Sequence, residues 1–213
     1  MIKNEKQKIY CIKIIFLGES GVGKTSLENV YLDKIFSPNE MATCQPYETF
    51  KEVDMGNNIK LNISLWDTAG QEQYRSVSRS FIKGSNIVFF VYDVTRRETF
   101  LELNYWISAV NEELNTDEVI LCIVANKIDL FLNSEVNKKE GEDYAKKKNA
   151  LFCETSAKED QKGFKNVVQK LLEKLLSTQA ILDNFEEVKD LSFNLKEDEK
   201  KKPEGKKCCG GLD

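Results

Sequence analysis

Residues 18–25 read Gly-Glu-Ser-Gly-Val-Gly-Lys-Thr and lie between an apolar run at 9–17 and a helical pattern at 24–32. They match G-x-x-x-x-G-K-[ST], a motif that requires a strand before it and a helix after it. The glycines let successive backbone N–H groups point at phosphate oxygens, and the helix start adds its positive dipole end. Lys24 can reach the β and γ phosphates, and the Thr25 hydroxyl can bind Mg²⁺. This context disfavours a Gly-rich turn that binds nothing. The predicted phosphate-binding residues are Ser20, Gly21, Val22, Gly23, Lys24, Thr25 and Ser26.

The rest of the chain alternates short apolar runs with helical patterns. Strands are predicted at residues 9–17, 61–66, 87–92, 119–125 and 150–153. Helices are predicted at residues 24–32, 73–83, 98–114, 135–147 and 161–176. Strands separated by helices indicate a mainly parallel, doubly wound α/β sheet. Residues 196–207 are almost all charged or turn-forming, so we expect one domain over 1–177 and a flexible tail over 178–213.

The composition excludes several kinds of chemistry. Lys and Arg number 31 against 35 Asp and Glu, and the net charge of −4 gives no general attraction to nucleic acid. The sequence has no histidine, which removes His-based triads and most transition-metal sites. Cys11 and Cys122 lie in apolar runs and no CxxC pair occurs, which favours buried free thiols in a reducing compartment. The charged start predicts neither a signal peptide nor a spanning helix there.

A second motif, Asn126-Lys127-Ile128-Asp129, directly follows the strand predicted at 119–125. The phosphate motif alone leaves an ATPase, a kinase and a GTPase open. A carboxylate at Asp129 can accept hydrogen bonds from the N1 and N2 donors of guanine, a donor pair that adenine lacks. Asn126 can tie this loop to the phosphate loop, and the Lys127 stem can cover one face of the base. The motif therefore favours a guanine nucleotide.

Four motifs occur in order, GESGVGKT at 18–25, WDTAGQE at 66–72, NKID at 126–129 and ETSAK at 154–158. The last contains Ser156, Ala157 and Lys158, and the Ala157 N–H is available to the guanine O6. In this order the set resembles the Ras superfamily of small GTPases, and VYDVTRRETF at 91–100 with a terminal Cys pair is most similar to the Rab family. The resemblance implies a P-loop small-GTPase fold, a six-stranded and mostly parallel sheet with one antiparallel edge and five flanking helices. It also implies an enzyme that hydrolyses GTP to GDP and phosphate, slowly without an activating protein.

The segment after the 61–66 strand carries the expected catalytic parts. Asp67 can hold Mg²⁺ through water, and Gly70 can bring its N–H close to a γ-phosphate. Gln71 can orient the attacking water because its amide both accepts and donates hydrogen bonds, and it is the predicted catalytic residue. The alternative is a plain polar turn, which the two nucleotide motifs disfavour.

Two residues of the preceding loop are assigned by the family's spacing. Thr43 lies 18 residues after Thr25, the family's interval between its two Mg²⁺-binding hydroxyls. Phe36 falls where the family stacks an aromatic ring on guanine, and a core role is its alternative. The loop departs from the Rab pattern T-I-G-x-x-F, because Cys-Gln-Pro-Tyr-Glu follows Thr43. The family's particular effectors are therefore not carried over.

Cys208 and Cys209 follow a lysine-rich segment near the end of the sequence. Rab proteins carry two prenyl groups on such cysteines, and stable anchoring takes two chains. The resemblance implies attachment to the cytoplasmic face of an intracellular membrane, with a cytosolic pool. Two unmodified thiols are the alternative, because Gly-Gly-Leu-Asp follows the pair and is longer than the common Rab endings.

The resemblance thus implies a monomer that cycles between GTP and GDP, uses Mg²⁺ and regulates vesicle or membrane traffic. Its implied partners are guanine nucleotide, an exchange factor, a GTPase-activating protein, effectors, and prenylation escort and extraction proteins. Nucleic acid is not among them. The alternative is a nucleotide-bound scaffold with little GTP turnover and atypical effectors, which the unusual loop at 44–48 favours.

Overall fold

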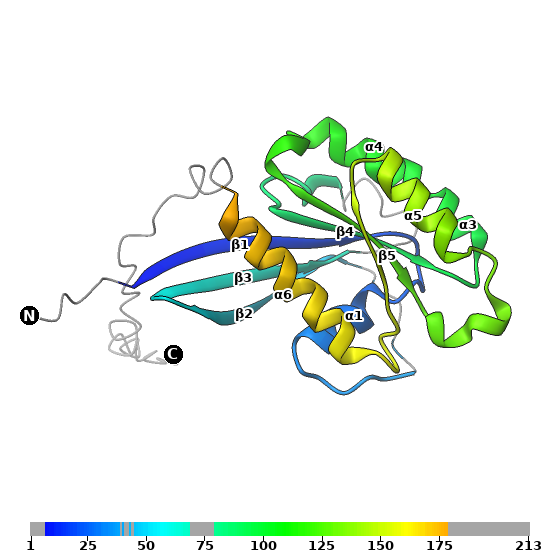
Figure 1. The fold of residues 1–213 in the computed structure, drawn as a ribbon, viewed down its shortest axis with the longest axis horizontal. Helices are drawn as coiled ribbons and strands as arrows, with labels where there is room; N and C mark the ends of the chain where they lie inside the picture. The colour runs from blue at the N-terminus through cyan, green and yellow to red at the C-terminus, as the bar shows by residue number, and fades with distance from the viewer. Residues whose placement is uncertain (1–6, 39, 41–42, 44, 69–78, 179–213) are drawn as a thin grey trace, which may run out of the picture.

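The structure, a computed structural model, describes residues 7–38, 40, 43, 45–68 and 79–178. A sheet with the strand order β2-β3-β1-β4-β5-β6 forms its centre (Figure 1). Its six strands are β1 Lys8–Leu17, β2 Tyr47–Gly56, β3 Ile59–Asp67, β4 Ile87–Asp93, β5 Ile120–Asn126 and β6 Leu151–Glu154. The edge strand β2 is antiparallel to β3, and every other neighbouring pair is parallel. The predicted α/β fold class is confirmed.

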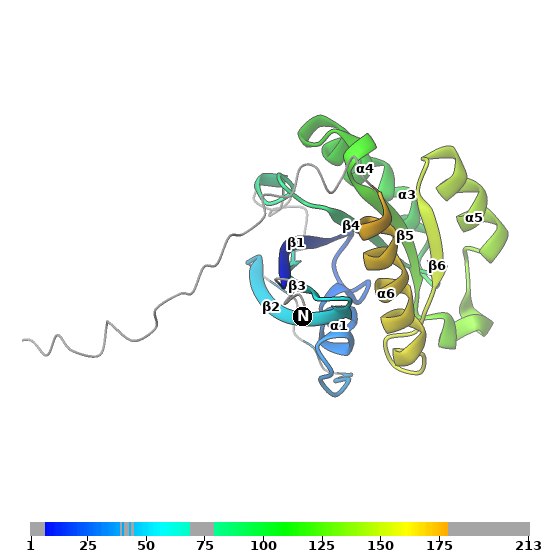
Figure 2. The same cartoon turned by 60° about the vertical axis from the view of Figure 1, so that its left-hand side comes forward.

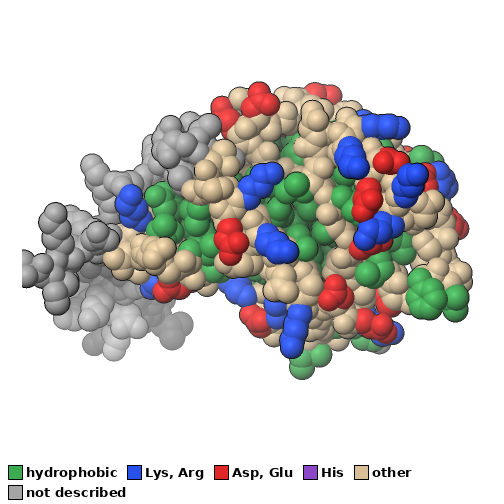
Figure 3. Space-filling model, in the orientation of Figure 1, with side chains coloured by type: hydrophobic (Ala, Val, Ile, Leu, Met, Phe, Trp, Pro, Cys, Tyr) green, Lys and Arg blue, Asp and Glu red, His purple; other side chains and the backbone are tan. Residues whose placement is uncertain are grey.

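Helices cover both faces of this sheet. The α-helices are α1 Lys24–Tyr31, α3 Arg97–Leu101, α4 Leu103–Glu113, α5 Lys138–Lys147 and α6 Gln161–Ser177. Two 3₁₀ helices, η2 Thr116–Glu118 and η3 Ile128–Asn133, flank β5. Helices α1 and α6 lie on one face of the sheet, while α3, α4 and α5 lie on the other (Figure 2). Side chains of both charge signs are interspersed over the surface that α6 crosses (Figure 3).

Alternation along the central strands divides the core into two layers. On β1, Ile14 and Phe16 pack toward α1 and α6, whereas Ile15 and Leu17 pack toward α3, α4 and α5. Successive side chains of a strand point to opposite faces, so a strand buried on both sides reads as one continuous apolar run. All residues of β4 and of β5 are buried, as expected from their sequences.

Two helices differ from the sequence prediction, and one strand had no counterpart in the residue pattern. The helix predicted at 98–114 is two helices that meet at Glu102, where the Tyr105 N–H bonds the Glu102 carbonyl in a tighter i to i−3 turn. Helix α5 begins three residues late, because the Asn137 side chain accepts from the Glu140 N–H and fixes the N-terminus there. Strand β2 was implied only by the resemblance. Its inner face carries the polar Thr49 and Lys51 before the apolar Val53 and Met55, so no continuous apolar pattern marks it.

Two predicted segments fall wholly or partly outside the described residues. Of the helix predicted at 73–83, the structure describes residues 79–83 and shows 79–80 as helical.

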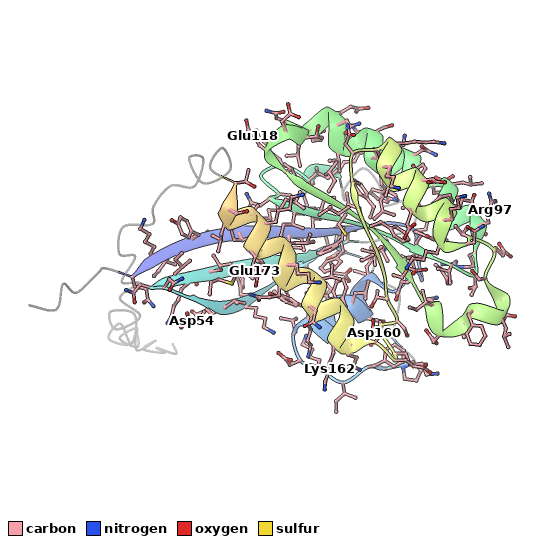
Figure 4. All side chains as sticks on the ribbon, in the orientation of Figure 1. Asp54, Arg97, Glu118, Asp160, Lys162 and Glu173 are labelled. Atoms are coloured by element: carbon pink, nitrogen blue, oxygen red, sulfur yellow. The ribbon has the colours of Figure 1, made fainter. Side chains whose placement is uncertain are left out.

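Helix α6 begins where the Asp160 side chain, labelled in Figure 4, accepts from the Gly163 N–H at 3.0 Å. It ends at Ser177, and residues 179–213 are not described, so the division into a domain and a tail stays a prediction.

Candidate nucleotide site

The loop between β1 and α1 has a backbone that its glycines permit. Gly18, Gly21 and Gly23 have φ angles of 144°, 74° and 97°, in the range that favours glycine. A Cβ on Gly18 would lie 2.2 Å from the Val91 carbonyl oxygen, and one on Gly23 would lie 2.4 Å from the Asn126 amide nitrogen. Both positions therefore require glycine for space as well as for backbone angle.

Asn126, at the end of β5, ties this loop to two others. Its buried side-chain amide donates to the Val22 carbonyl at 2.8 Å and accepts from the Ala157 N–H at 3.2 Å. A trans peptide points its carbonyl and its N–H in opposite directions. Holding the Val22 carbonyl on the Asn126 side therefore turns the Gly23 N–H the other way. The predicted link between the two loops is present in the structure.

Lys24 is buried at the first position of α1. Its ammonium donates to the carbonyls of Gly18 at 2.9 Å and Glu19 at 3.0 Å. Burial lowers the pKa of Lys24 to about 8, against the opposing effect of the Asp67 carboxylate. The desolvated ammonium of Lys24 therefore interacts strongly with phosphate oxygens, because charge-assisted hydrogen bonds are strong where water is excluded.

The three predicted magnesium ligands meet at one point. The Thr25 and Thr43 hydroxyl oxygens lie 3.0 Å apart, and both donate to Asp67 Oδ2, at 2.5 and 2.9 Å. Asp67 is completely buried, and burial raises the pKa of its carboxyl. Its second oxygen, Oδ1, has no hydrogen-bond partner among the described residues. Oxygen ligands around an unsatisfied buried carboxylate fit Mg²⁺, which binds such groups directly or through water.

These groups line one cavity of about 470 Å³. Of the predicted nucleotide-binding residues, its lining includes Ser20, Gly21, Gly23, Lys24, Thr25, Ser26, Phe36, Thr43, Asn126, Lys127, Asp129, Ser156, Ala157 and Lys158. Val22 is absent from the lining because its side chain packs in the core. Phe36 lines the cavity and also packs against the core, and its stacking on guanine stays a prediction. Predicted residues Gly70, Gln71, Cys208 and Cys209 lie outside the described residues.

Two carboxylates, Asp129 and Asp93, fix side chains at the end of the cavity that Lys127 and Asp129 line. Asp129 Oδ1 accepts from the Ser156 hydroxyl at 2.6 Å, which joins the two loops predicted to hold the base. The Lys127 ammonium lies 2.7 Å from Asp93 Oδ2, and Asp93 is buried at the end of β4. Burial works against ionisation of Asp93, but hydrogen bonds from Lys127 and Thr95 outweigh it and lower the Asp93 pKa.

Sequence reasoning missed a buried carboxylate beside the metal ligands. Glu28 of α1 is completely buried, and burial raises its pKa to about 7. The Thr49 hydroxyl donates to Glu28 Oε1, and the Tyr47 hydroxyl interacts with both Glu28 and Asp67. Glu28 Oε2 has no hydrogen-bond partner in the described structure. The available signal was a charge beside Leu27 on the apolar side of α1.

Comparison with known proteins shows which protein family this chain resembles. The model of the Ras family matches residues 13–177. Ras-related protein Rab-18 of Caenorhabditis elegans is 38% identical over 187 residues, 86% of this chain and 89% of the relative. Ras-related protein Rab-18-B of Danio rerio is 36% identical over 201 residues, 94% of each chain. Ras-related protein Rab-17 of Mus musculus is 39% identical over 168 residues, 78% of each chain.

Proposed function

The chain belongs to the Ras family of small GTPases, and we propose that the cavity lined by the loops after β1, β5 and β6 is its guanine-nucleotide site. As a Rab-like member of this family it is a GTP-binding enzyme that hydrolyses GTP. The observation that carries the proposal is the convergence of three separate loops on one cavity. The phosphate loop, the loop with Asp129 and the loop with Ala157 all line it.

Base recognition rests on Asp129 and its neighbours. Its carboxylate accepts hydrogen bonds from the N1 and N2 donors of guanine. The Ser156 hydroxyl of the adjacent loop donates to the same carboxylate and fixes its position. An adenine base lacks both donors and would leave the carboxylate with the Ser156 hydroxyl alone, and a missing pair of hydrogen bonds at a polar site gives strong discrimination. The Lys127 ammonium forms an ion pair with Asp93, so the aliphatic part of the Lys127 side chain stays at the cavity wall beside the base.

Phosphate and metal binding rest on the other end of the cavity. Lys24 and the inward N–H groups of the loop bind the phosphate oxygens. The hydroxyls of Thr25 and Thr43, and the carboxylate of Asp67 through water, would hold Mg²⁺, which would supply positive charge to the phosphates. Thr43 joins this group from a separate loop, so the loop's position depends on what the site contains. That dependence is the basis of a GTP–GDP switch.

Hydrolysis is assigned to Gln71, which orients water, with Gly70 offering its N–H to the γ-phosphate. Both assignments come from the sequence. A scaffold with little GTP turnover is the second candidate, and the unusual start of β2 favours it. Tyr47 pairs with Asp67 in the sheet and its hydroxyl interacts with that carboxylate, a contact that ties the loop to the site more firmly than a released switch requires.

The cellular role is proposed from the Rab likeness. We infer a regulator of vesicle or membrane traffic that uses an exchange factor, an activating protein, effectors and prenylation proteins. Cys208 and Cys209 carry the lipid anchor that holds it on the cytoplasmic face of an intracellular membrane, and the chain works as a monomer with a cytosolic pool. Within the described residues, helices are too short or too polar to cross a bilayer.

The test is the nucleotide itself. The purified protein is denatured and the released nucleotide is identified by chromatography. A second sample is then loaded with GTP and Mg²⁺, and GDP formation is followed with time. We expect stoichiometric guanine nucleotide and slow conversion of GTP. Release of an adenine nucleotide would contradict the proposed site. A protein that releases no nucleotide and cannot be loaded with GTP would also contradict it. Tightly held GTP without turnover would favour the scaffold.

A further inference from the structure

Arg96 contacts the phosphate loop from outside the cavity. It follows β4, and its Nη2 donates to the Ser20 carbonyl at 2.9 Å although the two residues are 76 positions apart. A Cβ built on Gly21 would lie 3.6 Å from the same nitrogen. The guanidinium therefore lies alongside the Ser20–Gly21 peptide. Arg96 is not among the residues that line the cavity.

The direction of this contact determines where the Gly21 N–H points. The carbonyl and the N–H of a trans peptide are opposed, so a Ser20 carbonyl held by Arg96 leaves the Gly21 N–H facing the other side. Gly21 lines the cavity and Arg96 does not, which agrees with an N–H directed into the cavity. Hydrogen bonding at the carbonyl also polarises the peptide, and a cationic donor does so most strongly. The Gly21 N–H becomes a better donor to phosphate.

The structure uses the same arrangement twice. Asn126 holds the Val22 carbonyl at 2.8 Å and so turns the next N–H, that of Gly23. Arg96 and Asn126 thus act on alternate peptides of one loop. Asn126 is the last residue of β5, and Arg96 lies shortly after the end of β4, the neighbouring central strand.

Asp93 fixes Arg96 in this position. Arg96 Nε lies 3.4 Å from Asp93 Oδ2, and the same oxygen accepts from the Lys127 ammonium at 2.7 Å. Asp93 is 2% exposed, and its other oxygen accepts from the Thr95 N–H and hydroxyl. One buried carboxylate therefore orients a cation at the phosphate end and a cation at the base end of the cavity.

We propose that Arg96 is a positioning residue that orients and polarises the Ser20–Gly21 peptide for binding phosphate. The proposal rests on the proposed nucleotide site. It assigns a part in nucleotide retention to Arg96, the first of the two arginines in the VYDVTRRETF segment. Arg96 acts through Gly21 and not through direct contact with the nucleotide.

The test compares Arg96→Gln with Arg97→Gln in the full chain bound to GDP. Arg97 is the matched control, because its guanidinium pairs with Glu140 at the outer edge of the molecule, where Figure 4 labels it. Two quantities are measured, the GDP dissociation rate and the amide proton shifts of Gly21 and Gly23. For Arg96→Gln we expect about tenfold faster GDP release, which corresponds to about 1.4 kcal/mol, and an upfield shift of the Gly21 amide proton. Gly23 should not move, and Arg97→Gln should match the wild type.

Each outcome decides the proposal. An unchanged Gly21 amide shift, or a dissociation rate equal to that of Arg97→Gln, overturns it. Faster release with equal shifts at both glycines indicates general loosening of the loop and also overturns it. Arg96→Lys, which keeps a cation, should fall between Arg96→Gln and the wild type in both quantities, and it decides the question in the same way if Arg96→Gln does not fold. Failure of the wild type to bind GDP overturns the proposed function as well.

Discussion

Replacing Glu28 with Gln should change how the stability of the protein depends on pH. Glu28 has a pKa near its ordinary value of 4.5 when the chain is unfolded, and burial raises it to about 7 in the fold. The folded protein therefore binds this proton more tightly than the unfolded chain. The resulting stability is complete below about pH 4.5, is lost as the pH rises, and is gone above about pH 7. The Gln side chain carries no proton to lose.

The size of the effect follows from the gap between the two pKa values. A gap of about 2.5 units corresponds to about 3 kcal/mol, and about 2–3 kcal/mol of it falls between pH 5 and pH 8. The wild type should lose this amount relative to Glu28→Gln over that range. Gln keeps an oxygen that can accept from the Thr49 hydroxyl, so the cluster keeps that contact.

Urea unfolding of both proteins across this range, with GDP and Mg²⁺ at equal saturating concentrations, measures the difference. Titrating groups that do not interact with Glu28 contribute equally in the two proteins and cancel in the comparison, whereas Asp67 and Tyr47 are coupled to Glu28 and belong to the measured difference. We expect the free energy of unfolding of Glu28→Gln, relative to the wild type, to increase from pH 5 to about pH 7 and to change little from there to pH 8. Parallel pH profiles would refute the inference that Glu28 is buried and holds a proton near neutral pH.

Three further changes test separate parts of the site. Asp129→Asn should weaken GDP binding by about 2 kcal/mol, because a charged acceptor contributes about 1.5–3 kcal/mol, and titration with fluorescent GDP measures the loss. Gln71→Leu should leave GTP binding intact and slow single-turnover hydrolysis about tenfold or more, and equal rates would remove Gln71 from catalysis. Replacing both Cys208 and Cys209 with Ser should move the protein from membranes to cytosol in a flotation gradient, whereas one replacement should leave weaker, reversible binding.

The apolar central strands were predictable because their environment is uniform. Residues of β4 and β5 are buried on both faces, so their sequence shows the burial directly. The edge strand β2 has one exposed face and an inner face that includes Lys51, whose ammonium contacts the Tyr31 carbonyl and Asp33. It pairs with β3, and Val53 and Met55 of its inner face pack against the core, but Thr49 and Lys51 on the same face interrupt the apolar period in the sequence.

Some residues of the site could be predicted from the sequence and others could not. Residues of the phosphate loop act through local backbone geometry, so a short motif predicts them. Asp93, Arg96 and Glu28 act through contacts between distant segments, such as Arg96 with Ser20, and no spacing rule marks such pairs. Their contacts depend on the folded arrangement of β1, β4 and β2, which a single sequence does not display.

The central claim is that this cavity holds a guanine nucleotide through Asp129, and base competition tests it most directly. Fluorescent GDP bound to the wild type is displaced by unlabelled GDP or by ADP, and the two half-displacement concentrations are compared. Sites that hydrogen-bond a ligand's donors reject analogues that lack them by roughly 10⁴–10⁵-fold, and we expect a preference for GDP of about that size. Equal displacement by GDP and ADP would contradict the assignment of the base site.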